Sequence, residues 1–76
     1  MSTVDRLIQL AAKRFKADPA GLSPEDDFFD KLGIDSLKAL DLLTDVEESF
    51  GVEIPDYELQ GVVTFAALAA VIDRRK

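Results

Sequence analysis

The sequence predicts an all-α fold, a small four-helix bundle of three longer helices and one short helix, with a long loop between helices I and II. Apolar residues recur at helical spacing in three segments, and glycine and proline interrupt the chain between them. The 76 residues, 47% of them hydrophobic, suffice for one core and one domain, residues 1–76. Because the sequence contains no cysteine, no disulfide reinforces that core.

The first helix is predicted over residues 4–15, where the apolar positions fall at i, i+3, i+4, i+7, i+8 and i+11. Arg6, Lys13 and Arg14 lie outside that pattern, so the apolar stripe is one-sided. The stripe comprises Val4, Leu7, Ile8, Ala11, Ala12 and Phe15.

A long loop is predicted between this helix and residue 35. The run Asp18-Pro19-Ala20-Gly21 stops the first helix, and the segment after it contains Pro24, Gly33 and a cluster of acids. A loop of this length tends to contain a turn of its own, which Ser23-Pro24 can begin, and we expect little more regular structure there. The residues expected to pin the loop to the core are Phe28, Phe29 and Leu32.

Three further helices are predicted after this loop. Helical periodicity returns from Ser36 to Phe50, with Gly51 as the C-terminal glycine of the second helix. Asp56 can cap a short third helix that ends at about Gln60, and Thr64 can cap the last helix. The residues of the last helix that are predicted to face inward are Phe65, Leu68, Ala69 and Ile72.

The charge and composition limit the classes of function. The net charge is −6, and the whole acidic excess lies in residues 35–60, where Lys38 stands against eight acids. This balance argues against nucleic acid and anionic membrane as partners and favours basic proteins. With neither cysteine nor histidine, the usual nucleophile–base pairs and zinc sites cannot be assembled, so we expect no metal site and no enzyme. The absence of a membrane-length apolar run and of a signal peptide predicts a cytoplasmic protein without membrane insertion. We also expect a monomer.

Ser36 is the residue on which a chemical function depends. It stands in the first turn of the second helix, where backbone N–H groups and the helix dipole stabilise an attached anion by about 0.3–1 kcal/mol. Asp35 and Ser36 are also ordinary helix-starting residues, worth about 1 kcal/mol as caps. By itself, the tripeptide Asp35-Ser36-Leu37 is more often a cap than a modification site.

The second helix is predicted to present an acidic face to solvent. At about 100° per residue, one side collects the apolar residues and the opposite side collects the acids. Leu37 lies among the acids, and Leu40, Thr44 and Glu47 fill the border. An exposed leucine surrounded by carboxylates is what a transient protein-docking surface requires. The predicted buried face comprises Ala39, Leu42, Leu43, Val46 and Phe50, and the predicted acidic face comprises Asp41, Asp45 and Glu48.

In order and spacing, three segments resemble an acyl carrier protein along the full chain. They are residues 28–37 (FFDKLGIDSL), the acidic helix that follows, and residues 50–56 (FGVEIPD). The resemblance implies that Ser36 is esterified with 4′-phosphopantetheine, which a separate phosphopantetheinyl transferase takes from coenzyme A. The thiol of that arm then carries acyl groups as thioesters, which a chain without cysteine cannot do by itself. The protein would be a phosphoprotein of fatty-acid, polyketide or other lipid metabolism and not the catalyst.

The resemblance also implies roles for the neighbours of the serine. Asp35 would orient it for the transferase, and Leu37 would contact the transferase and later enzymes. Acids of the second helix would meet basic patches on acyl-loading and chain-processing enzymes. The predicted partner face comprises Leu37, Lys38, Leu40, Asp41, Thr44, Glu47 and Glu48. The lining predicted for a site that shelters the acyl chain comprises Phe28, Val46, Ile54, Leu59 and Ala67.

Lys38 departs from the family pattern, in which an acid often follows Asp-Ser-Leu. The dipole disfavours a cation in the first turn of a helix by roughly a few tenths of a kcal/mol. An ion pair with Asp41 at i+3, worth about 0.2–0.5 kcal/mol, is the favoured compensation. The alternative is that Lys38 neutralises part of the partner face and marks a specialised carrier, to which Thr44 also points.

The cargo and one alternative class of function stay open at this point. The cargo can be a fatty acyl, a polyketide or another specialised acyl group, and the residues before Ser36 favour acyl over aminoacyl cargo. An acidic helical adaptor without a cofactor would explain the charge but not the order of the motifs. A calcium module is disfavoured because no calcium-binding loop of the EF-hand type is present.

Overall fold

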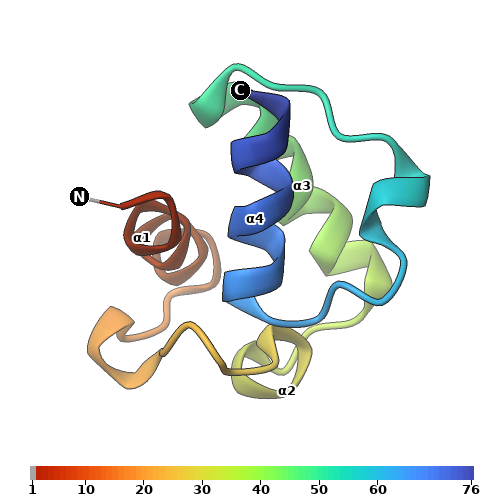
Figure 1. The fold of residues 1–76 in the computed structure, drawn as a ribbon. Helices are drawn as coiled ribbons and strands as arrows, with labels where there is room; N and C mark the ends of the chain where they lie inside the picture. Colours follow the sequence, from red (N-terminus) through yellow and green to blue (C-terminus); the bar gives the residue numbers. More distant parts are fainter. Residues whose placement is uncertain (1) are drawn as a thin grey trace.

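The computed structural model describes residues 2–76, which form four α-helices and two 3₁₀ turns (Figure 1). In chain order the elements are α1 (Thr3–Phe15), η1 (Pro19–Gly21), α2 (Phe28–Leu32), α3 (Ser36–Phe50), η2 (Asp56–Leu59) and α4 (Phe65–Arg75). Apart from one bridging pair, Asp27 and Thr64, these residues form no β-structure, so the predicted all-α fold is confirmed. Within this range, no helix has both the length and the apolar character that a membrane span needs.

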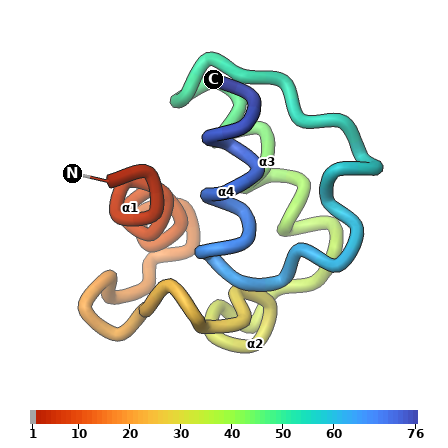
Figure 2. Tube along the Cα trace, viewed as in Figure 1, coloured from red at the N-terminus to blue at the C-terminus, as the bar shows by residue number. Residues whose placement is uncertain are grey.

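Helix α1 packs against both α4 and α3. Figure 1 shows α4 in front of α3, α1 nearly end-on beside them, and α2 below. The Cα trace in Figure 2 shows that the chain between α3 and α4, which includes η2, runs along the side of the molecule opposite α1. The side that carries η2 is therefore bounded by α2, α3 and α4 and is not covered by α1.

Side chains and glycines fix the ends of the long helices. The Ser2 hydroxyl accepts a hydrogen bond from the Asp5 amide at 3.2 Å and begins α1. The Thr64 hydroxyl caps α4 in the same way, as predicted. Gly51 ends α3 in the left-handed conformation, with a φ of 67°, also as predicted.

The segment between α1 and α3 differs from the predicted long loop, because it contains η1 and α2. The Asp27 carboxylate caps α2 by accepting a hydrogen bond from the Phe29 amide at 2.8 Å, and Gly33 ends it with a φ of 63°. Five residues are too few to show helical periodicity, which is why the sequence did not reveal this helix. Phe28 is buried, with its ring centre 5.8 Å from that of Phe65, so the predicted pinning of this segment is confirmed.

The core joins the apolar faces predicted for the three long helices. The faces of α1 and α4 are buried along most of their length. On α3 the central positions Leu42 and Val46 are completely enclosed, whereas the flanking positions are half-buried. The half-buried members of the predicted faces are Ala39, Leu43 and Phe50 on α3 and Val4 and Phe15 on α1.

The predicted third helix is a single 3₁₀ turn with a different start. Asp56 is the first residue of η2 and not its cap, and η2 has no side-chain cap. The turn closes when the Glu58 amide donates to the Pro55 carbonyl at 3.0 Å. Pro55, whose side chain has no hydrogen-bond acceptor, takes the cap position, so the predicted cap at Asp56 is wrong.

Side chains instead tie η2 to the end of α4. Arg74 and Arg75 each donate a hydrogen bond to a different oxygen of the Glu58 carboxylate, both at 3.1 Å. Arg75 also donates to the Tyr57 hydroxyl at 3.2 Å. The two arginines, chiefly the hydrogen bond from Arg74, hold the pKa of the Glu58 carboxyl below its ordinary value. We call Glu58, Tyr57, Arg74 and Arg75 the η2 clasp.

The burial of α3 can be tested at Leu42, which has 1% of its surface exposed. Leu42→Ala is expected to lower the free energy of unfolding by about 2–5 kcal/mol, because it removes buried apolar atoms and leaves a cavity. Leu37→Ala, on the exposed side of the same helix, is expected to change it by less than about 0.5 kcal/mol. Urea denaturation followed by circular dichroism measures both values. Equal losses in the two variants would contradict this orientation of α3.

The η2 clasp can be tested through pH. A carboxyl whose pKa is lowered by folding stabilises the folded state above its unfolded pKa, which for Glu58 is about 4.5. That stabilisation is lost as the pH falls through the lower, folded pKa. Below about pH 4.5 the unmodified protein is therefore expected to lose stability more steeply than Glu58→Gln, which has no carboxyl to titrate. Denaturation midpoints measured across this pH range test this expectation. Parallel curves for the two proteins would show that the η2 clasp does not contribute to stability.

Candidate functional site

Ser36 is the first residue of α3, and its side chain is exposed. The Asp35 carboxylate accepts a hydrogen bond from the Lys38 amide at 3.0 Å, so Asp35 and not Ser36 caps the helix. Among residues 2–76, no hydrogen bond engages the Ser36 hydroxyl. Ser36 is therefore not needed as a cap, and its hydroxyl is available for chemistry.

Next to this serine, α3 presents apolar and acidic side chains together. Leu37 and Leu40 are 74% and 53% exposed. Asp41 and Glu48 are exposed on the same helix. Exposed leucines with carboxylates beside them have the composition of a docking surface, in which apolar contact lies at the centre and charge at the rim.

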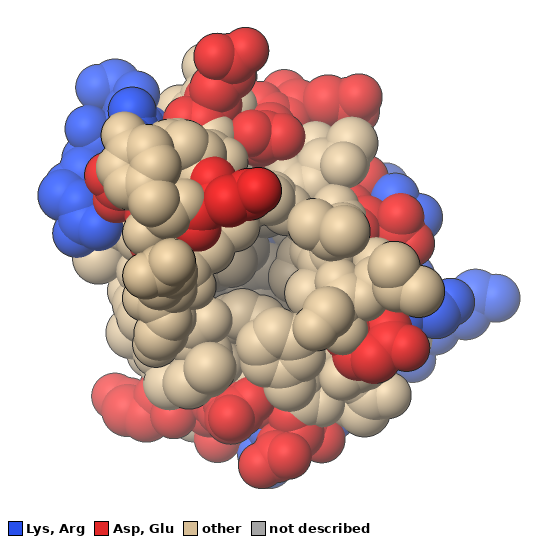
Figure 3. Space-filling view, turned by 90° about the vertical axis from the view of Figure 1, so that its right-hand side faces the viewer, with Lys and Arg blue, Asp and Glu red and all other residues tan. Residues whose placement is uncertain are grey.

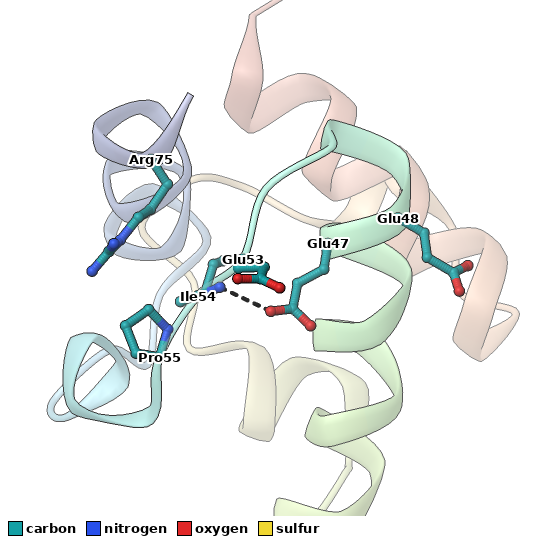
Figure 4. A pocket seen from close by; sticks show the side chains of 6 residues that line it. All are labelled: Glu47, Glu48, Glu53, Ile54, Pro55 and Arg75. Atoms are coloured by element: carbon teal, nitrogen blue, oxygen red, sulfur yellow. Dashed lines mark hydrogen bonds between the residues drawn. The ribbon is translucent and has the colours of Figure 1, made fainter.

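Two acids of α3, one from the predicted acidic face and one from its border, bind within the protein. Asp45 is half-buried and binds Arg14 of α1 through two hydrogen bonds of 2.6 and 2.7 Å. The prediction of an exposed Asp45 is wrong because α1 brings a cation opposite it, and the same hydrogen bonds raise the pKa of the Arg14 guanidinium. Glu47 accepts a hydrogen bond from the Ile54 amide at 2.8 Å, which fixes the chain that leaves α3 (Figure 4). Part of the acidic charge of α3 therefore stabilises the fold.

Lys38 does not form the ion pair with Asp41 that the sequence favoured. Among the ion pairs within residues 2–76, none includes the Lys38 ammonium group. Helix geometry explains the difference. Side chains lean toward the N-terminus of a helix, which makes a lysine followed by an acid the less favourable order. The positive charge therefore stays on the exposed surface beside Leu37.

An apolar cavity of about 110 Å³ opens beside α3. It differs in part from the predicted site, because Phe28 and Leu59 line it but Val46, Ile54 and Ala67 do not. Val46 and Ile54 belong to the filled core instead. Figure 3 shows that the face carrying η2 is hollowed at its centre, with mostly uncharged residues around the hollow and acidic residues at its upper rim and toward the edges of the face. The lining consists of the apolar residues Phe28, Phe29, Ala39, Leu40, Leu42, Leu43, Leu59, Val62 and Leu68.

The cavity and Ser36 share one side of α3. Ala39, Leu40 and Leu43 follow Ser36 at i+3, i+4 and i+7, which is the spacing of neighbours on a helix surface. An arm attached to Ser36 therefore begins on the side of α3 that leads to the cavity. The same spacing is visible in the sequence, and it would have identified these three lining residues.

A larger hollow of about 570 Å³ lies at the other end of α3 (Figure 4). Glu47, Glu53 and Arg75 contribute to its lining, and Figure 4 shows the Glu47 carboxylate directed toward Ile54 while Glu48 is directed away. Glu47 stands eleven residues after Ser36, or roughly 16 Å along the helix axis. Because this hollow is charged, open and distant from the serine, the smaller apolar cavity is the better site for an aliphatic group.

The surroundings of Ser36 fit an arm joined through a phosphodiester. The hydroxyl is exposed, and it stands at the N-terminus of a helix of 15 residues, where the dipole favours an attached anion. No carboxylate other than Asp35 lies within two positions of it in the chain, and Asp35 already accepts a backbone hydrogen bond. The apolar cavity on the same side of α3 fits an aliphatic group carried by such an arm.

Comparison with known proteins is consistent with this geometry. Residues 5–72 match the family described as "Phosphopantetheine attachment site". The acyl carrier proteins of two Helicobacter pylori strains are each 33% identical to this chain over 76 residues, which are 100% of this chain and 97% of each relative. The acyl carrier protein of a third Helicobacter pylori strain is 30% identical over the same span. The chain therefore belongs to the acyl carrier protein family, whose covalent cofactor is 4′-phosphopantetheine.

Proposed function

We propose that this chain is an acyl carrier in which Ser36 bears 4′-phosphopantetheine and the thiol of that arm holds acyl groups as thioesters. The observation that carries the proposal is the exposed, unbonded Ser36 hydroxyl at the start of α3, in a chain of this family. A protein without cysteine has no thiol of its own, and the arm supplies one. The chain carries the acyl group, and other enzymes perform the reactions on it.

Asp35 and Leu37 are proposed to prepare the serine for the transferase. The Asp35 carboxylate holds the first turn of α3 through the Lys38 amide, so the backbone under Ser36 is fixed before the transferase arrives. Leu37 offers an exposed apolar contact directly beside the hydroxyl. Because the hydroxyl is already held in place and has an apolar contact beside it, less entropy is lost when the transferase binds.

The proposed partner face lies on the exposed side of α3. Its leucines offer apolar contact, and its free carboxylates attract basic patches on the transferase and on enzymes that load or process acyl chains. Such steering raises encounter rates while binding stays weak, so that one carrier visits several enzymes in turn. Thr44 and Glu47 contribute less charge or polarity to partners, because each also bonds within the protein. The face comprises Leu37, Lys38, Leu40, Asp41, Thr44, Glu47 and Glu48.

The cavity is proposed to shelter the part of the acyl chain nearest the thioester. Its lining is apolar, and each methylene group moved from water into such a site gains about 0.8 kcal/mol. A charged aminoacyl group would lose hydration there without finding a partner. The cavity thus favours fatty acyl, polyketide or other specialised acyl cargo. The cytoplasmic location and monomeric state expected from the sequence stay predictions.

Attachment of the cofactor is tested by mass. Incubation with coenzyme A and a phosphopantetheinyl transferase is expected to add one phosphopantetheine group to the unmodified protein and none to Ser36→Ala. Ser49→Ala is the matched control, because Ser49 is another exposed serine of α3. This variant should gain the phosphopantetheine group as fully as the protein of the original sequence. Addition that survives Ser36→Ala would contradict the site, and no addition with several transferases would contradict the carrier function.

Lys38 is proposed to make this carrier selective for a dedicated set of enzymes, since its charge is unpaired within residues 2–76. Lys38→Glu restores an acid beside Leu37 and is expected to slow reactions with dedicated enzymes by about two- to tenfold at low salt, through slower association. Lys13→Glu on α1 changes the net charge equally and serves as the control. Unchanged rates of Lys38→Glu with every partner enzyme would refute the selective role.

A further inference from the structure

One wall of the apolar cavity is held in place less firmly than the others. Phe28, Leu42 and Leu68 come from α2, α3 and α4 and are buried members of the core. Leu59 and Val62 come from η2 and the turn after it, and η2 contains no buried residue. A single 3₁₀ turn without a side-chain cap has weak hydrogen bonds of its own. Apart from the packing of Leu59 and Val62 against the core, the attachment of this wall depends on other elements.

The η2 clasp supplies that attachment. Within residues 2–76, the side-chain hydrogen bonds of η2 all run to Arg74 and Arg75 at the end of α4. The Glu58 side chain is only 23% exposed, so its ion pairs are screened less than fully exposed ones. Glu58 directly precedes Leu59 in the chain. The position of its carboxylate therefore determines how close Leu59 lies to the other walls of the cavity.

The cavity is small for an acyl chain. Its volume of about 110 Å³ is below that of the engineered cavity of about 150 Å³ that binds benzene, a molecule of six carbons. As built, it accommodates fewer than about six carbons. A longer chain is sheltered only when a wall moves, and η2 is the wall with the least buried surface.

We propose that Glu58, held by Arg74 and Arg75, limits the length of the acyl chain that the cavity shelters. The inference rests on the proposed carrier function. While the clasp is closed, η2 keeps Leu59 against the other walls, and only the first carbons of a chain are covered. Val62 is held separately, because the Phe28 amide of α2 donates to the neighbouring Val63 carbonyl at 2.9 Å. When the clasp is broken, η2 moves outward and more of the chain enters. Glu58 is thus a positioning residue that acts on specificity through η2.

A series of chain lengths tests the clasp. A phosphopantetheinyl transferase loads Ser36 from acetyl-, butyryl-, hexanoyl-, octanoyl- and decanoyl-coenzyme A, and intact mass confirms each loading. The rate at which hydroxylamine cleaves the thioester then measures how well the chain is sheltered. In the unmodified protein, protection is expected to rise by up to about fourfold for each methylene group that enters the cavity and to level off near hexanoyl. In Glu58→Gln it is expected to rise further, through octanoyl and decanoyl.

Two further variants make the comparison specific. Asp45→Asn also replaces a carboxylate by its amide and breaks an ion pair between two elements, with Arg14, but neither residue lines the cavity. In this variant, protection of the thioester is expected to level off at the same chain length as in the unmodified protein. The double variant Arg74→Gln, Arg75→Gln removes the same ties from the α4 side and is expected to behave like Glu58→Gln.

The outcomes separate the clasp from the carrier function. The clasp is overturned when Glu58→Gln levels off at the same chain length as the unmodified protein, or when Asp45→Asn shifts that length equally. It is also overturned when the unmodified protein shows no levelling-off, or when both clasp variants lose protection at every length. Failure to load the unmodified protein contradicts the carrier function itself, and intact mass reveals it before hydroxylamine is added.

Discussion

The complete burial of Leu42 and Val46 fixes the rotation of α3 about its axis, and the arrangement of the site depends on that rotation. Successive residues of a helix are about 100° apart, so a shift by one position would turn a different set of side chains toward the core. With these two residues inward, Leu37 faces solvent and Leu40 reaches the edge of the cavity. Core packing therefore decides which surface stands beside Ser36.

Several carboxylates of this acidic chain are bound by groups from other elements, and the others are exposed to solvent. Asp45 meets Arg14 of α1, and Glu58 meets the arginines at the end of α4. Glu47 meets a free backbone amide of the chain that leaves α3. A small core without disulfides benefits from such ties, because connecting segments bury little apolar surface of their own. The acidic charge that stays unbound on the surface of α3 is smaller than the composition suggests, and Asp41 and Glu48 carry most of it.

The sequence allowed the long helices, their caps at Thr64 and Gly51 and the position of Ser36 in the first turn of α3 to be predicted, because each depends on local spacing or on a residue's own backbone preference. It did not reveal α2, whose five residues are held by the Asp27 cap and by burial of Phe28 rather than by periodicity. The partners of Asp45 and Glu47 were missed for a different reason. They come from elements distant in sequence, and no local pattern records which cation or amide the fold brings opposite a carboxylate. The lining of the cavity was predicted only in part for the same reason.

In the proposed carrier, helix α3 places the partner face and the acyl site on two adjacent stripes that begin beside Ser36. One stripe runs through Leu37, Asp41 and Glu48 and is exposed, and the other runs through Ala39 and Leu43 and lines the cavity. Side chains on the two stripes point in different directions, so a substitution on one stripe leaves the contacts of the other intact. Leu40 is the exception, because it lines the cavity and is still 53% exposed. A protein that covers Leu40 also covers part of the cavity lining, so the proposed partner face and the proposed acyl site meet at this one side chain.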